Sequence, residues 1–142
     1  QSIAVLYRSN QMTVQLEPME AAEKRAEEMG VRVLLQGSQP QALEIRTLIA
    51  LAIRECAANC ARHAAGTELY VRVRSESRRT EVILTNNGVA PKGEITEGGG
   101  LSMLRHRVEE VGGSIEIQSI PRFKLMLRLL EKEGTAHESD DC

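Results

Sequence analysis

The stretch Leu43–Ala65, LEIRTLIALAIRECAANCARHAA, constrains the fold more than any other part of the chain. Its apolar residues recur at close to the 3.6-residue period of an α-helix. They form a stripe made of Ile45, Leu48, Ile49, Ala52, Ile53, Cys56 and Cys60. We therefore expect one long central helix, buried along this stripe and ended at Gly66.

A row of polar residues lies beside this stripe. Glu55, Asn59 and His63 are spaced four and four, and each such step advances only about 40° around a helix, so the three side chains project along one side. Arg62 is next to them. A carboxylate, an amide, an imidazole and a guanidinium together suit a divalent cation and phosphate oxygens. The solvated face of a half-buried helix would show the same spacing, because charged faces are common.

Composition narrows the class of protein. At 142 residues, with 42% hydrophobic and 27% charged residues, the chain is expected to form a single domain with a real core. Tyr7, Tyr70 and Phe123 are its only aromatic residues, so it lacks the stacking platforms of single-stranded nucleic-acid binders. The net charge of −2 gives no general attraction to polyanions, and we expect no nucleic-acid partner.

The three cysteines do not indicate a disulfide framework. Cys56 and Cys60 lie one turn apart on the apolar stripe, and Cys142 ends a polar tail, which indicates a reducing compartment. Together with His63 the two stripe thiols would supply three metal ligands, but no fourth ligand is in view. Core packing of both thiols is the better interpretation.

The sequence contains no apolar run of about 18 residues and no signal-peptide pattern. We expect a cytoplasmic domain that makes no membrane contact of its own. The chain begins with Gln1 rather than Met, which indicates a fragment of a longer protein whose other parts are free to carry a membrane anchor.

Turn-forming residues divide the chain before the central helix. Residues 2–16 fit a helix end or a short extended segment equally well. Pro18 suits the first turn of a helix that runs to Met29, and Gly30 is its natural stop. Val31–Leu35 is a short β-rich run and is expected to form a strand.

The start of the central helix carries its own signal. Gly37 ends the strand, and Ser38 with Gln41 resembles a capping box. Pro40 would then lie in the first helical turn.

Beyond Gly66, alternating apolar and polar residues predict strands. Leu69, Val71 and Val73 form one run and Val82 and Leu84 the next, so the two should pair as an antiparallel hairpin with one face on the core. The later elements are expected to be a helix over residues 101–111, closed by Gly112-Gly113, and strands over residues 114–120 and 123–130.

These elements predict an α+β fold in two layers, with helices on one face of a mixed sheet of about five strands. We divide the chain into an N-terminal segment and first helix (1–30), a core (31–130) and an acidic, disordered tail (131–142).

Two loops carry further chemistry. Asn86-Asn87-Gly88 ends a strand, where a plain hairpin turn is one interpretation and a site that reads a flat ligand edge is the other. Gly98-Gly99-Gly100 leads into a helix at Leu101, where the free N–H groups of the helix N-terminus attract phosphate. Such a loop is also a common flexible connection. It fits neither a Walker A motif nor a dinucleotide fingerprint.

The order of these features resembles the ATP-binding domain of bacterial two-component sensor histidine kinases, members of the GHKL ATPase superfamily with gyrase and MutL. Arg54–Ala64, RECAANCARHA, is similar to the family's N box. Gly98–Gly113, GGGLSMLRHRVEEVGG, is similar to its G box and the helix that follows. The resemblance covers about residues 31–130 and implies a Bergerat-type ATP-binding sandwich.

The resemblance also implies roles for single residues. Glu55 would be the catalytic base or polariser of the attacking nitrogen, and Asn59 would coordinate Mg²⁺. The ATP lid would be residues 89–99. The expected nucleotide-binding residues are Asn59, Arg62, His63, Asn86, Gly88, Gly98, Gly100 and Leu101.

Two positions depart from the family pattern. The family's adenine-reading Asp falls on Asn86, where a neutral amide replaces a charge-assisted bond at a cost of about 1 kcal/mol. A supporting Thr falls on Lys124. Both departures leave the affinity for ATP open.

The family phosphorylates a His on a separate dimerising domain, and no segment of this chain resembles that domain. The resemblance therefore implies three partners: a His-bearing dimerisation domain of the same protein, a response regulator downstream, and a second copy in a parent homodimer. Two alternatives stay open. One is a degenerate nucleotide-binding or interaction module, and the other is an anti-sigma-factor Ser kinase of the same superfamily.

Overall fold

The computed structural model describes residues 17–91 and 99–131. The expectations for residues 1–16, for the acidic tail and for most of the lid, including Gly98, lie outside the described residues. In chain order the elements are α1 (Pro18–Glu28), β1 (Arg32–Gly37), α2 (Leu43–His63), β2 (Glu68–Glu76), β3 (Arg79–Asn86), α3 (Gly100–Glu110), β4 (Ser114–Gln118) and β5 (Lys124–Leu130).

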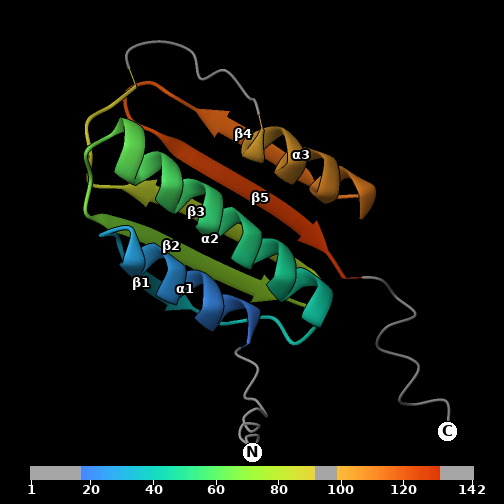
Figure 1. The fold of residues 1–142 in the computed structure, drawn as a ribbon. Helices are drawn as coiled ribbons and strands as arrows, with labels where there is room; N and C mark the ends of the chain where they lie inside the picture. The colour runs from blue at the N-terminus through green and yellow to red at the C-terminus, as the bar shows by residue number, and fades with distance from the viewer. Residues whose placement is uncertain (1–16, 92–98, 132–142) are drawn as a thin grey trace, which may run out of the picture.

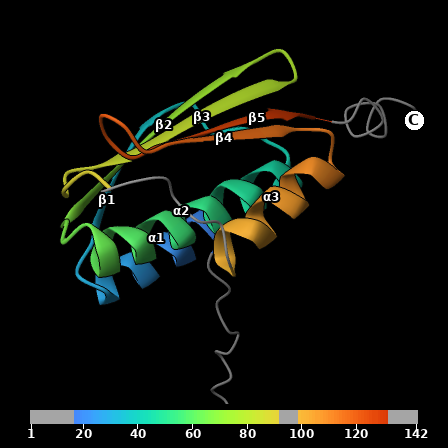
Figure 2. The same cartoon turned by 90° about the horizontal axis from the view of Figure 1, so that it is seen from above.

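The described elements form two layers. Five strands make one sheet in the order β1-β2-β3-β5-β4, and β1 is parallel to β2 while the other neighbours are antiparallel. The three helices lie on one face of this sheet, with α2 between α1 and α3 (Figure 1; Figure 2). The predicted two-layer α+β fold with a mixed five-stranded sheet is confirmed.

The apolar stripe of α2 is the centre of the core. All seven of its predicted members are buried, and they pack against the inward side chains of the sheet. The inward residues of the central strands alternate as predicted, with Leu69, Val71 and Val73 on β2 and Val82 and Leu84 on β3. Burial of this aliphatic set is the main force that holds the helix layer on the sheet.

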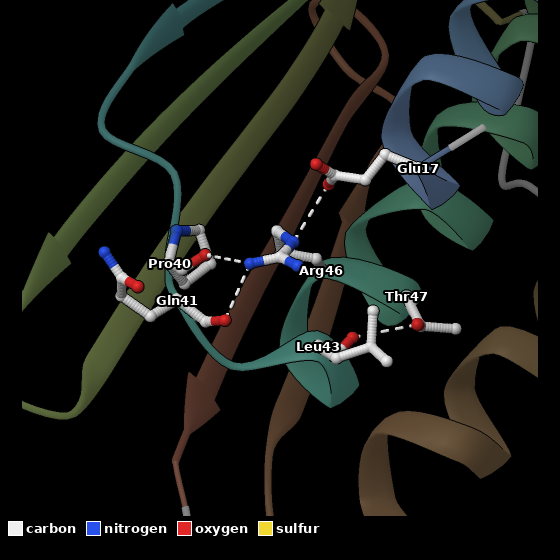
Figure 3. Close-up of polar contacts among 6 residues, drawn as sticks. All are labelled: Glu17, Pro40, Gln41, Leu43, Arg46 and Thr47. Atoms are coloured by element: carbon white, nitrogen blue, oxygen red, sulfur yellow. Dashed lines mark hydrogen bonds and ion pairs between the residues drawn. The ribbon is translucent and has the colours of Figure 1, made fainter. Parts of the chain in front are cut away.

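The capping box and the first-turn proline predicted for α2 are wrong, whereas the expected start at Leu43 is confirmed. The helix begins at Leu43 with Ala42 as its N-cap, and no side chain caps it, so Ser38 and Gln41 form no capping box. Instead the Arg46 side chain reaches back and donates from Nη1 to the carbonyl oxygens of Gln41, at 2.6 Å, and Pro40, at 3.3 Å (Figure 3). These two bonds hold Pro40 in the loop before the helix rather than in its first turn.

Arg46 also connects α2 to the start of α1. Its Nε lies 2.9 Å from Oε1 of Glu17, the residue that precedes α1 (Figure 3). Both atoms are sealed from solvent, and neither makes a hydrogen bond, so the contact is an ion pair without hydrogen-bond geometry. The two side chains are 23% and 39% exposed, and the pair joins the fourth residue of α2 to the residue that precedes α1.

The C-terminal end of α2 is joined to the end of β3. The Val89 N–H donates to the Ala64 carbonyl at 2.9 Å, and the Asn87 side-chain oxygen accepts from the N–H groups of Thr67 and Glu68 at 2.9 Å each. Gly88 lies so close that a Cβ built on it would be 2.4 Å from the Ala64 carbonyl oxygen. Only glycine allows this approach of the two backbones.

We predict that Gly88→Ala destabilises the fold by about 1–3 kcal/mol, because the new methyl group would overlap a backbone carbonyl that cannot move alone. Urea unfolding of the variant measures this loss. Gly100→Ala is the matched control, since its new methyl group would meet only the end of a side chain. Equal stability of the Gly88 and Gly100 variants would contradict the close backbone approach.

Candidate functional site

Two rows of side chains on α2 face the same cavity. The row predicted from the sequence is Glu55, Asn59 and His63. A second row, Arg54, Ala58 and Arg62, runs beside it at the same four-residue spacing. The small Ala58 side chain leaves open space between its two arginines.

The cavity has a volume of about 590 Å³, within the range of small-molecule sites. Helix α1 contributes Arg25, and Met29 follows it; the ends of β3 and β5 and the start of α3 supply the remaining walls. Besides the two rows of α2, the described lining residues are Arg25, Met29, Ala64, Asn86, Val89, Pro91, Gly100, Leu101 and Phe123.

One end of the cavity is where α2 meets the first residue of α3. A Cβ built on Gly100 would lie 1.6 Å from Oε1 of Glu55, so the Glu55 carboxylate occupies the space above this glycine. Gly100 is the first residue of α3, whose first N–H groups have no partner inside the helix. A carboxylate and a helix N-terminus therefore lie side by side here.

The other end lies beside the last turn of α2, where Val89 and Phe123 are apolar lining residues and Asn86 is a buried amide. Asn86 is 7% exposed and ends β3, facing the helices beside its ladder partner Leu69. Continuing the β3–β5 register past Thr85 and Lys124 sets Asn86 opposite Phe123, which also lines the cavity. The Asn86 side-chain oxygen accepts a hydrogen bond from the Gly88 N–H at 2.7 Å.

The described walls of the cavity are positively charged. The described lining includes three arginines, Arg25, Arg54 and Arg62, and one carboxylate, that of Glu55. None of the three arginines has a hydrogen bond or ion pair with the described residues. Unpaired guanidinium groups around one cavity suit an anionic ligand such as a phosphate chain.

Most of the predicted site residues lie around this one cavity. Gly88 is the exception among those described, since it shapes the wall behind Asn86 but does not line the cavity. The residues brought together are Glu55, Asn59, Arg62, His63, Asn86, Gly100 and Leu101.

The expectation for Lys124 is wrong. Lys124 pairs with Thr85 on the face of the sheet opposite the helices, in a groove with Leu34 and Tyr70. Because side chains alternate between faces, its neighbour Phe123 faces the cavity instead. Lys124 is therefore not among the residues that line the cavity.

Arg25, Arg54 and Phe123 were missed as site residues. Arg54 stands next to Glu55, and its four-residue spacing to Ala58 and Arg62 was a usable signal. Arg25 comes from a different helix, and only the packing of α1 against α2 brings it to the cavity. No local pattern could have found it.

The two buried thiols belong to the core, as predicted. Burial raises the pKa of the Cys56 thiol far above its usual range, and the nearby Glu55 carboxylate adds to the shift. Burial also raises the pKa of Cys60, whose Sγ donates weakly to the Glu68 carbonyl at 3.9 Å. The described residues contain no group of three or more His, Cys, Asp or Glu side chains arranged to hold a metal ion.

Across residues 17–91 and 99–131, none of the helices has the length and apolar character needed to cross a membrane.

No protein-family model matches the sequence. The fold, however, matches solved histidine kinases. A blue-light-activated histidine kinase of Erythrobacter litoralis aligns with 81% of this chain at a TM-score of 0.61 and 16% identity, over 45% of its own chain. Its histidine kinase domain alone aligns with 81% of this chain at a TM-score of 0.58 and 16% identity, over 61% of that chain.

A second protein gives the same result. The Acinetobacter baumannii histidine kinase AdeS aligns at a TM-score of 0.59 and 15% identity, over 80% of this chain and 60% of that one. The fold is therefore that of histidine kinase domains. The chain spans only 45% to 61% of the length of these structures.

We predict that Glu55 and Gly100 are energetically coupled, because a methyl group at Gly100 would overlap the Glu55 carboxylate. In a double-mutant cycle of Gly100→Ala and Glu55→Ala, followed by urea unfolding, the coupling energy should be at least about 0.5 kcal/mol. The overlap is relieved when Glu55 is truncated. Arg54→Ala is the matched control, because none of the atoms nearest the added methyl group belongs to Arg54. The unfolding free-energy changes of Arg54→Ala and Gly100→Ala should therefore be additive.

Proposed function

We propose that this chain is the nucleotide-binding catalytic domain of a sensor histidine kinase, which transfers the γ-phosphoryl group of Mg·ATP to a histidine on a separate domain. One observation carries the proposal: on a histidine kinase fold, a single cavity has a carboxylate, an amide and unpaired arginines along α2, and a buried amide near the apolar residues Val89 and Phe123. That polarity matches a nucleotide, whose phosphates are anionic and whose base is flat and largely apolar.

In this proposal the phosphate chain lies along the charged part of the cavity. Arg54, Arg62 and Arg25 neutralise its oxygens, and His63 adds a further donor on the same helix. Gly100 and Leu101, at the start of α3, line the triphosphate with backbone N–H groups. Gly98 is proposed as a further binding residue from the sequence. Because phosphoryl transfer needs mainly positioning and charge neutralisation, these residues supply what the reaction requires.

Asn59 is the residue that would hold Mg²⁺. Its half-buried amide is the only uncharged group on the two α2 rows with an oxygen that can bind a metal ion. The Glu55 carboxylate lies one helical turn away. Such a sparse donor set fits a cation that keeps several waters and shares phosphate oxygens, rather than one enclosed by protein ligands. When bound, Mg²⁺ would neutralise charge on the transferring phosphoryl group.

Glu55 would act on the attacking imidazole. It is the only acidic residue among the described lining residues, so it is the available proton acceptor. The imidazole nitrogen forms a bond to the γ-phosphorus, the bond to the bridging oxygen of ADP breaks, and Glu55 takes the proton that the imidazole releases.

The acceptor histidine would come from another domain. His63 lines the cavity as a binding residue, and His106 lies exposed on α3 beside Glu110 at 3.3 Å. In the proposal a His-bearing dimerisation domain of the parent protein supplies the acceptor, and a response regulator then receives the phosphoryl group. The match to only part of each solved histidine kinase agrees with a parent that has further domains.

A nucleotide-binding module without transfer activity is the second candidate. Asn86 favours it, because a neutral amide whose oxygen already binds the Gly88 N–H makes a weaker reader of adenine than a carboxylate.

The proposal predicts saturable binding of ATP that Mg²⁺ strengthens, measured by calorimetry with Mg²⁺ and with EDTA. Asn59→Ala should lose the Mg²⁺-dependent gain, by about 10- to 100-fold, and leave Mg²⁺-free binding unchanged. Asn59→Asp, which keeps an oxygen ligand, is the matched control and should retain the gain. Absence of saturable binding by the unmutated chain at millimolar ATP would contradict the proposal.

A transfer assay separates the candidates. With radiolabelled ATP and a His-bearing acceptor domain, a kinase should give an acid-labile, alkali-stable phosphate that Glu55→Gln greatly reduces. Binding without transfer would favour the module, and an acid-stable product on serine would favour the anti-sigma-factor kinase.

A further inference from the structure

The helices leave one face of the sheet open. All three lie on the other face, and within residues 17–91 and 99–131 no helix or strand covers this one (Figure 2). Because side chains alternate along a strand, every second residue points to the open side. On β2, for example, the exposed Tyr70, Arg72 and Arg74 alternate with buried residues. We call the side chains of the strands that point away from the helices the outer face.

Basic side chains follow one another along the outer face. Arg79 pairs with Leu130, the last residue of β5, and Arg74, Arg72 and Lys124 each lie one step of two residues further along the strands. Each step is about 7 Å, so the four residues extend over about 20 Å. We call Arg79, Arg74, Arg72 and Lys124 the basic row. It starts where β5 ends.

The basic row lacks counter-charges. None of its four members has a hydrogen bond or ion pair with the described residues. The carboxylates of the outer face are occupied elsewhere: Glu81 and Glu116 contact Arg128 at 3.6 and 3.5 Å, and Glu68 accepts a tyrosine hydroxyl at 2.7 Å. Among the described strand residues, Glu76 is the one acidic side chain of this face without such a contact. Four unpaired cations therefore stand against one unpaired carboxylate.

The chain that follows β5 carries the opposite charge. Residues 132–142, KEGTAHESDDC, contain one lysine and four acidic residues, Glu133, Glu138, Asp140 and Asp141. This acidic segment starts beside the first member of the basic row, because the Glu131 N–H donates to the Arg78 carbonyl at 2.8 Å, next to Arg79. Charge complementarity and position thus point to the same occupant for the outer face.

The acidic segment is long enough to reach the whole row. Seven residues of extended chain, the separation of Glu131 and Glu138, span up to about 23 Å, more than the length of the row. Single ion pairs at a surface are weak, but a tethered segment binds at a high effective concentration, so several weak pairs can act together.

We propose that residues 132–142 dock on the outer face over the basic row, and that this chain covers the open side of its own sheet by charge pairing. The inference does not depend on the proposed function, because the nucleotide cavity lies on the helix side of the sheet. A separate acidic partner could then bind this face only by displacing the segment.

Cys142 allows a direct test, because the other two cysteines are buried in the core and a nitroxide maleimide would label Cys142 selectively. Backbone amide signals of the full chain are recorded by NMR with the label oxidised and reduced. At low salt we expect the amides of Arg72 and Thr85 to lose most of their signal to the oxidised label, and those of α1 to keep theirs. In about 1 M salt, where the Debye length is about 3 Å, the loss should disappear.

Reversing charge on the outer face should also abolish the effect. In Arg72→Glu/Arg74→Glu the signals of β2 and β3 should return. Lys24→Glu/Arg107→Glu is the matched control, since it reverses two exposed cations on the helices that do not line the cavity. The control should show the same signal loss as the unmutated chain.

A variant of the acidic segment leaves the sheet untouched. Glu138→Gln/Asp140→Asn/Asp141→Asn removes three charges outside the described residues, and it should restore the Arg72 and Thr85 signals without any change in the fold. Undiminished signals in the labelled, unmutated chain at low salt would overturn the inference, and so would a loss that persists in this variant.

Poly-glutamate added in solution distinguishes the acidic segment from a separate partner. We expect it to shift the Arg72 amide at lower concentration in the neutralised variant than in the unmutated chain, because the native segment competes for the basic row. Equal titrations of the two proteins would mean that the outer face is open to separate acidic partners, and they would overturn the assignment of residues 132–142 as its occupant.

Discussion

The connection between the end of α2 and the end of β3 is the contact on which the candidate site depends. Gly88 lets the two backbones approach, the Val89 N–H binds the Ala64 carbonyl, and the Asn87 side chain binds the N–H groups that open β2. This contact sets Asn86 beside the last turn of the helix whose earlier turns carry Asn59 and Glu55. The distance from Glu55 to Ala64 along the helix is about 13 Å, so one rigid element fixes both ends of the cavity relative to each other. A site built on such an element keeps its geometry better than one built on loops.

Charge in the cavity comes from more than one helix. Arg54 and Arg62 belong to α2, whereas Arg25 arrives on α1, which the Glu17–Arg46 ion pair holds at its far end. An anion in this cavity would therefore contact two helices that the apolar core already packs together. Glu55 carries the opposing charge, and its place over Gly100 sets this carboxylate beside the α3 N-terminus.

The sequence predicted the layers, the strands and most of the cavity because those features follow local periods. The stripe from Ile45 to Cys60 and the alternation of Val71 and Val82 are repeated signals, and repetition makes them hard to misread. The capping box before α2 was predicted wrongly because Arg46, a residue within the helix, binds the loop carbonyls, and capping rules consider only residues at the cap. Lys124 was assigned to the wrong face because strand register near a turn is uncertain by one residue. Arg25 and the direction of the Asn86 amide depend on contacts between distant segments, which no local pattern records.

The hairpin between β2 and β3 has a consequence for the distant cavity. Its turn consists of Ser77 and Arg78, and Glu76 pairs directly with Arg79. This length sets the register of β3, and the register sets whether Asn86 faces the helices or the uncovered side of the sheet. A slip of one residue in this register would carry every side chain of β3 to the opposite face, and the buried amide would become a surface group. The ligand chemistry of the cavity thus depends on a two-residue turn roughly 25 Å away along the strand.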